Sequence, residues 1–269
     1  MKRKTNITKT IALHYWKLVV RSILFLTALV VYIINRLNNS GQSFGGYENN
    51  EVVLGVVWLI FMGEMVLRFF PVKLESMGCQ KQFKKNYIEI EDCDKKPIVQ
   101  AGIVTFAVAS AWIALNAVIG VLYYTHVIDK GILLLIALLY SVCDVICILF
   151  FCPFQTWFMK NKCCGTCRIY NWDYAMMFTP LIYIPNVYAW TLLGMALLLL
   201  IKWEVVLHVY PKRFSEKCNK SLSCALCKEK LCHHKKQLQV FLKNGKFNLT
   251  GNTLIKVLKR DYDKDGKTK

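Results

Sequence analysis

Two long stretches of the chain contain no formally charged residue. Lysine and arginine are concentrated in the segments that flank the apolar stretches. Residues 97–128 and 174–201 are uncharged, and each is longer than the roughly 20 apolar residues that a helix needs to cross a bilayer. Over the whole chain, 55% of residues are hydrophobic and the mean hydropathy is +0.34. This composition does not suit a soluble surface, so we expect an all-α, polytopic helical membrane protein.

Hydrophobicity and charge together divide the chain into a membrane domain, residues 1–209, and a short basic Cys/His-containing tail, residues 210–269. We predict about six transmembrane helices, near residues 18–37, 51–72, 98–124, 131–154, 169–184 and 187–207. The last two are separated at Pro185-Asn186, because this pair favours a turn. The alternative is about five helices, with the last uncharged run crossing once and the tail on the opposite face.

Positive charge indicates which face of the membrane the ends occupy. The formal net charge is +18, and residues 202–269 hold 17 Lys or Arg against 6 Asp or Glu. Because cytoplasmic loops carry the excess of Lys and Arg, we predict a multi-pass plasma-membrane protein with both termini cytoplasmic. The basic segments are expected to contact anionic lipid headgroups. No nucleic acid is expected as a partner, because no aromatic and basic recognition motif is present.

Clustered cysteines are the strongest candidates for chemistry in this sequence. Of the 12 cysteines, the predicted metal ligands are Cys164, Cys167, Cys218, Cys224, Cys227 and Cys232. They include two pairs with C-x2-C spacing, and two such pairs are the usual halves of a four-thiolate site for zinc or an iron–sulfur cluster. A helical hairpin between the pairs returns them to one membrane face, whereas the five-helix topology separates them. The tail alone also supplies four thiols, so the site can instead be local.

The cysteines therefore predict an integral membrane protein with a metal centre on its cytoplasmic face. An iron–sulfur cluster would indicate membrane-associated electron transfer with a redox partner protein, whereas zinc would be structural. In a reducing cytoplasm the same thiols can also stay free or take part in dithiol exchange. No G-x-S-x-G, H-E-x-x-H, P-loop or dinucleotide-binding motif appears, so the sequence assigns no enzymatic reaction.

Charged residues inside the predicted helices indicate a second function. Glu64 and Arg68 are one turn apart in the second helix, where they can pair with each other. Asp144 lies near the middle of the fourth helix, where an unpaired carboxylate is costly. Arg21 is expected in the first turn of the first helix, with its side chain reaching the headgroups. The alternative function is therefore a small transporter or channel-like protein that uses Asp144, Glu64 and Arg68, and a non-enzymatic membrane scaffold is the third.

The third predicted helix carries small residues at intervals of three and four. They are Ala107, Ser110, Ala111, Ala114, Ala117 and Gly120. Small side chains let two helix backbones approach each other closely. We therefore expect this face to pack against another helix.

Overall fold

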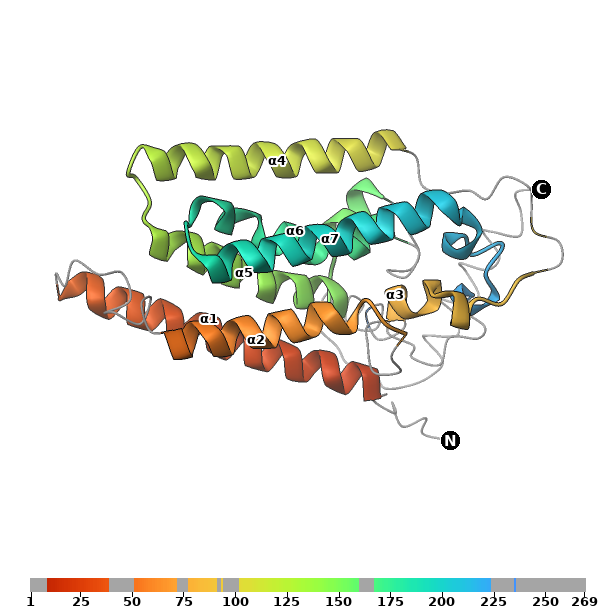
Figure 1. The fold of residues 1–269 in the computed structure, drawn as a ribbon, viewed down its shortest axis with the longest axis horizontal. Helices are drawn as coiled ribbons and strands as arrows, with labels where there is room; N and C mark the ends of the chain where they lie inside the picture. Colours follow the sequence, from red (N-terminus) through yellow and green to blue (C-terminus); the bar gives the residue numbers. More distant parts are fainter. Residues whose placement is uncertain are drawn as a thin grey trace, which may run out of the picture.

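The computed structural model describes residues 9–38, 51–71, 77–90, 93, 102–159, 167–223 and 235. These residues form an all-helical fold, as the sequence predicts, without a β-strand among them. The long helices are α1 (Lys9–Leu37), α2 (Glu51–Leu67), α4 (Gly102–Tyr124), α5 (Lys130–Leu149) and α7 (Val187–Val209), and the short ones are α3 (Met77–Gln82) and α6 (Asp173–Phe178). Single 3-10 or π-helical turns are Lys84–Asn86, Phe154–Phe158, Arg168–Trp172, Thr179–Tyr183, Pro211–Phe214 and Lys220–Leu222. The long helices lie along one common direction (Figure 1).

Four helical segments are long and apolar enough to cross a membrane: Thr10–Leu37, Gly102–Tyr124, Lys130–Leu149 and Val187–Val209. The apolar segment of α2, Gly55–Leu67, is shorter. The outward faces of these helices stay apolar, since Leu59 is 66% exposed, Ile103 83% and Val187 75%. An exterior of this kind suits lipid better than water. These helices therefore fit the predicted membrane class.

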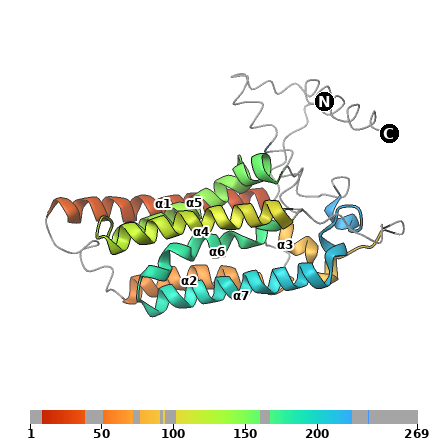
Figure 2. The same ribbon diagram turned by 90° about the horizontal axis from the view of Figure 1, so that it is seen from above.

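The helices form two layers with α6 between them. Helices α1, α4 and α5 lie on one side of α6, and α2 and α7 lie on the other (Figure 2). Helix α5 packs along α1 and also contacts α6, while α7 packs against both α2 and α6. Helix α4 stands at the edge of the bundle and reaches the rest mainly through the turn Thr179–Tyr183. The middle of the bundle is therefore filled by α5 and α6.

The turn expected at Pro185-Asn186 is present and separates two antiparallel helical segments. Residues 168–183 form one mixed stretch of 3-10 and α-helix that packs along α7. Helix α7 begins at Val187, and the Asn186 side chain caps it by accepting a 2.8 Å hydrogen bond from the amide of Tyr188. An asparagine in this position satisfies one of the helix's unpaired N–H groups. The pair therefore reverses the chain as predicted.

Helix α5 ends earlier than the sequence predicts, at Leu149 instead of residue 154. Pro153 lacks an amide proton and disfavours helical backbone in the residue before it, so the helix stops ahead of it. A π-helical turn, Phe154–Phe158, follows. As a result, Asp144 lies in the last two turns of α5 and not at its middle.

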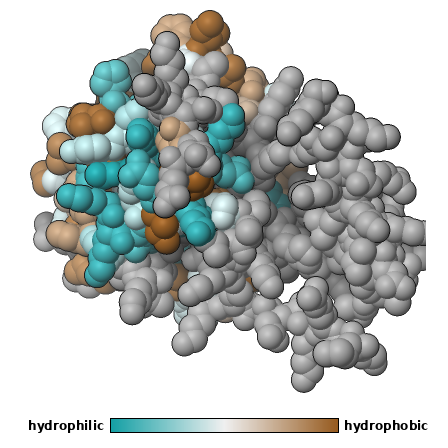
Figure 3. All heavy atoms as spheres, turned by 90° about the vertical axis from the view of Figure 1, so that its right-hand side faces the viewer, coloured by the Kyte–Doolittle hydropathy of each residue, from teal (hydrophilic) through white to brown (hydrophobic). Residues whose placement is uncertain are grey.

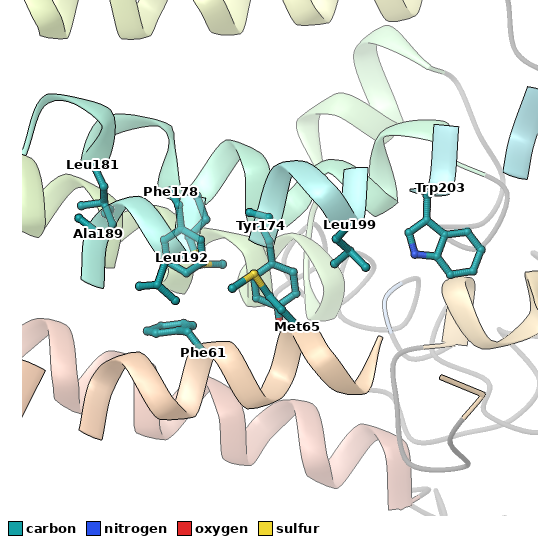
Figure 4. Close-up of a cluster of buried hydrophobic side chains, with 12 residues drawn as sticks. Phe61, Met65, Tyr174, Phe178, Leu181, Ala189, Leu192, Leu199 and Trp203 are labelled. Atoms are coloured by element: carbon teal, nitrogen blue, oxygen red, sulfur yellow. The ribbon is translucent and has the colours of Figure 1, made fainter. Parts of the chain in front are cut away.

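The largest hydrophobic core joins α2, α6 and α7. Phe61 and Met65 of α2 point toward Tyr174 and Phe178 of α6 (Figure 4), and all four side chains are at most 3% exposed. The rings of Phe61 and Phe178 meet edge to face, with 5.3 Å between their centroids. Further members come from α7 and the preceding turn: Leu181, Ala189, Leu192, Ala196, Leu199 and Trp203. This packing fixes α2 against α6, which matters for the charged residues described below.

The small residues of α4 face outward, with one exception. Ala107, Ser110, Ala111, Ala114 and Ala117 are all exposed, so they do not form the predicted packing face within this chain. Gly120 is buried, and a Cβ atom added there would overlap the ring and hydroxyl of Tyr183. The same hydroxyl donates a 2.9 Å hydrogen bond to the carbonyl oxygen of Asn116. Gly120 thus allows α4 to approach Tyr183 at a distance that leaves no room for a Cβ atom.

Candidate functional site

A buried arginine joins three helices inside the bundle. The guanidinium of Arg21, on α1, donates to Glu64 Oε2 of α2 at 2.7 Å and to Asp144 Oδ2 of α5 at 3.1 Å. It also donates to the carbonyl oxygen of Ser141 at 2.9 Å. Only 5% of Arg21 is exposed. A single cation therefore holds two carboxylates that come from two other helices.

Glu64 has further donors besides Arg21. The ammonium of Lys17 lies 3.2 Å from Glu64 Oε1, and the hydroxyl of Tyr174 donates to Glu64 Oε2 at 2.7 Å. Lys17 is on α1 and Tyr174 is on α6, so the carboxylate of Glu64 is bonded from both sides. Hydrogen bonds to a charged group are the stronger kind in proteins. Glu64 is thus the most heavily bonded carboxylate of the site.

A second ion pair lies next to the first. The Arg68 guanidinium donates to Asp173 Oδ1 at 2.8 Å and lies 2.6 Å from Asp173 Oδ2. The guanidinium also lies over the ring of Tyr174, 4.4 Å from its centroid. Because the Tyr174 hydroxyl bonds to Glu64, this tyrosine connects the two ion pairs.

The charge cluster, as we name it, consists of six residues in the described part of the chain: Lys17, Arg21, Glu64, Arg68, Asp144 and Asp173. Three are cations and three are anions, so their formal charges cancel. Cancellation matters because an unbalanced charge within a membrane bundle is costly. All six lie toward one end of the bundle, where α2 and α5 finish and α6 begins.

The pairing within the cluster differs from the pairing that the sequence predicts. Glu64 and Arg68 do share one face of α2, but Glu64 pairs with Arg21 of α1 and Arg68 pairs with Asp173 of α6. Arg21 is buried and lies three turns into α1, which begins at Lys9, and not in the first turn of the helix as predicted. Asp173 lies within the predicted helix 169–184 and begins α6. Spacing along one helix cannot reveal partners that tertiary packing supplies.

The predicted metal ligands fall mostly outside the described residues, which exclude Cys164, Cys224, Cys227 and Cys232. Cys167 is buried among the side chains of a small hydrophobic cluster. Cys218 forms a disulfide with Cys93, so position 218 offers no thiolate in this oxidation state. Within the described residues, no group of three or more His, Cys, Asp or Glu side chains is arranged to hold a metal ion. A zinc or iron–sulfur centre therefore stays a prediction.

Comparison of the chain with protein-family models, with curated proteins and with solved structures finds no match in any of the three. A function therefore has to be argued from the residues themselves. Among the described residues, the charge cluster joins more ionisable side chains than the separate ion pairs Arg168–Glu204 and Lys212–Glu89 do, so it is the candidate functional site.

Proposed function

We propose that the protein is a membrane transporter in which the charge cluster couples the movement of a small anion to the movement of protons. The observation that carries this proposal is the position of Arg21, which is shared between Glu64 and Asp144 inside the bundle. Ionisable groups at such positions are functional candidates by default. An arginine is also the side chain best suited to bind an oxyanion through two parallel hydrogen bonds.

Charge balance dictates how such a site would work. When an anion binds to Arg21, the cluster gains a negative charge. The net charge stays at zero if one carboxylate of the cluster binds a proton and becomes neutral. A proton bound to Asp144 removes that charge and also weakens its bond to Arg21, so the guanidinium can turn to the substrate. One proton would accompany each singly charged anion, and the combined step would be electroneutral. In a low-dielectric site this route avoids the large penalty of an uncompensated charge.

Asp144 is the better candidate for the coupling proton than Glu64. Among the described residues, Glu64 accepts bonds from Lys17, Arg21 and Tyr174. The contact shown for Asp144 is to Arg21 alone, and it is longer, at 3.1 Å. Releasing Asp144 therefore breaks fewer interactions, and we assign the coupling proton to it.

We infer that α2 and residues 168–183 cross the membrane together with the four longer helices, giving about six crossings and both termini on one face. The turn at Pro185-Asn186 supports this arrangement, since residues 168–183 lie against α7 on the way to it. The excess of Lys and Arg in the tail supports a cytoplasmic position for that face, in the plasma membrane.

Flux into proteoliposomes tests the proposal. Vesicles loaded with a pH-sensitive dye would receive inward gradients of chloride, nitrate, phosphate or succinate in turn, with and without valinomycin and potassium. We expect at least one of the singly charged anions, chloride or nitrate, to acidify the interior at a rate that the ionophore does not change, whereas a doubly charged anion carried with one proton would respond to the ionophore. Asp144→Asn should lower that rate by at least about tenfold, as expected for loss of an essential proton carrier.

The matched control is Asp129→Asn, at the opposite end of the same helix. Asp129 caps α5 by accepting a 2.9 Å bond from the amide of Ile132, and asparagine caps a helix equally well. This variant should transport like the wild type. Equal rates for the two aspartate variants, or no acidification with any of the four anions, would overturn the proposal.

A further inference from the structure

A small polar cap covers the end of the bundle next to the charge cluster. The cap consists of residues 77–90 and 93, which follow α2, and residues 211–223, which follow α7. Hydrophilic residues make up much of the described surface at this end (Figure 3). The two segments pair through the bridge between Glu89 and Asn219, with a 2.8 Å bond from the amide of Lys220 to the carbonyl of Ile88. The disulfide between Cys93 and Cys218 joins the same two segments covalently.

The interior of the cap contains buried amide side chains next to apolar ones such as Leu222. Asn219 has no exposed surface, and its side-chain nitrogen donates to the carbonyl oxygens of Lys81 at 3.0 Å and Arg213 at 2.9 Å. Because Asn219 directly follows Cys218, the disulfide holds this asparagine in place. Gln82, which is 1% exposed, follows Lys81 and accepts a 3.0 Å bond from the side chain of Asn171. The cap is thus bonded to the helical bundle at Asn171.

The cap reaches both sides of one ion pair of the charge cluster. Asn171 lies two residues before Asp173. On the other side, the Gln80 side chain donates to the carbonyl oxygen of Phe70, two residues after Arg68, at 3.3 Å. Two hydrogen bonds and the short chain segments between them therefore link the disulfide, through Asn219, Lys81 and Gln82, to the chain that carries Asp173.

We propose that the disulfide between Cys93 and Cys218 is a redox latch that holds the cap against this ion pair and so regulates the charge cluster. The effect on transport rests on the proposed function, whereas the latch itself does not. Reduction would free two chain segments that are 125 residues apart in the sequence. The cap would then be held by its hydrogen bonds and by the packing of Phe83 and Phe214 against Trp203, and it would release Asn171 and Phe70 more readily.

The chemistry of the latch is thiol–disulfide exchange with a cellular dithiol. The reductant's thiolate attacks Cys93, whose side chain is partly exposed, while Cys218 is fully buried. A mixed disulfide forms at Cys93, and the sulfur of Cys218 leaves as a thiolate that takes up a proton. The second thiol of the reductant then displaces Cys93, so two electrons and two protons pass to the latch and the reductant becomes a disulfide. Cytosolic disulfides are usually transient and redox-sensing, which agrees with a latch on a lysine-rich face.

Hydrogen exchange of the full chain in lipid nanodiscs tests the latch without any transport assay. We expect reduction with a phosphine to raise amide exchange several-fold both in the cap and in residues 169–174, because opening becomes less costly. The double variant Cys93→Ser/Cys218→Ser should exchange like the reduced wild type and should no longer respond to reductant. Cys143→Ser is the control, since Cys143 lies exposed on α5 and its loss should leave exchange unchanged.

Two results would overturn the latch. In the first, exchange rises in the cap but stays constant in residues 169–174, which would make the disulfide a local brace. In the second, alkylation of whole cells finds Cys93 and Cys218 fully oxidised whether or not the cells are treated with reductant or diamide. If the double variant does not fold, stepwise reduction of the wild type gives the same comparison. If the protein transports none of the anions but hydrogen exchange in the cap still responds to reductant, the proposed function is wrong and the latch is still supported.

Discussion

Replacing Arg21 by glutamine removes the cation that two carboxylates share. Glutamine keeps much of the side-chain length and one amide donor, so the change is mainly one of charge. Lys17 still neutralises Glu64 at 3.2 Å, but Asp144 loses the cation that bonds it. The formal charge of the cluster falls from zero to minus one.

The expected loss of stability can be bracketed from the two ways in which Asp144 can respond. Removing one partner of a buried ion pair typically costs about 3–5 kcal/mol. Asp144 can instead bind a proton. Protonating an ordinary carboxyl at pH 7 costs about 4 kcal/mol, so the loss of stability should not exceed this value. A residual hydrogen bond from the glutamine offsets about 1 kcal/mol. We therefore expect Arg21→Gln to lower the free energy of unfolding by about 3 kcal/mol.

Reversible unfolding in mixed micelles, followed by tryptophan fluorescence, measures this loss. Adding Asp144→Asn should restore much of the stability, because two cations then face two anions again. The double-mutant cycle should give a coupling of at least about 1 kcal/mol between the two positions. Asp129→Asn, which changes a carboxylate outside the cluster, should restore nothing.

A loss below about 1 kcal/mol, the range of exposed ion pairs, would refute the reasoning. It would mean that water screens the cluster and that charge balance does not constrain it. Additive effects of Arg21→Gln and Asp144→Asn would have the same consequence, since they would show that the two side chains do not depend on each other.

Three further substitutions test the packing, with unfolding of the same preparation as the assay. Gly120→Ala should cost about 1–3 kcal/mol because its Cβ would overlap Tyr183, whereas the control Gly194→Ala, which meets no atom within 4 Å, should cost nothing. Asn186→Ala should cost about 1 kcal/mol through loss of the cap of α7; no loss would mean that the cap does not stabilise the turn. Tyr174→Phe should cost about 1.5–3 kcal/mol by removing a bond to a carboxylate, and a neutral result would show that the hydroxyl finds water instead.

The helical class, the start of α7 and the turn at Pro185-Asn186 follow from the sequence because each depends on local chemistry. The extent of α1 does not, since hydropathy places a helix boundary where charged residues begin. The predicted helix 18–37 therefore begins after Lys17 and has Arg21 in its first turn, although α1 continues through both residues from Lys9. Their spacing of four, with His14 three residues earlier, was the available signal, because it puts three polar side chains on one face of the helix.

The cysteine pairing also could not be predicted from local sequence patterns. The C-x2-C spacing emphasises neighbours in sequence, but the disulfide in the described structure joins residues 125 positions apart. Cys93 and Cys218 meet because α2 and α7 pack together and finish at the same end of the bundle, which brings the segments after them into one cap. Predicting this pairing requires knowing which helices are neighbours in space, and a local sequence pattern does not contain that information.

The two ends of the bundle differ in a way that sets a direction for access to the charge cluster. At the end away from the cap, Tyr123, Tyr124 and Tyr183 form a group of rings with centroids 5.6–6.3 Å apart, and Gly120 allows Tyr183 to close against α4. At the cap end, hydrogen-bonded amides and one disulfide lie beside a second group of rings, Phe83, Trp203 and Phe214, with centroids 5.1–6.3 Å apart. Packed rings are therefore common to both ends, and within the described residues the disulfide is found at the cap end alone. Because reduction removes this covalent link and leaves the ring packing in place, we expect an anion and its proton to reach Arg21 through the cap, and we expect the oxidation state of Cys93 and Cys218 to decide how readily that path opens.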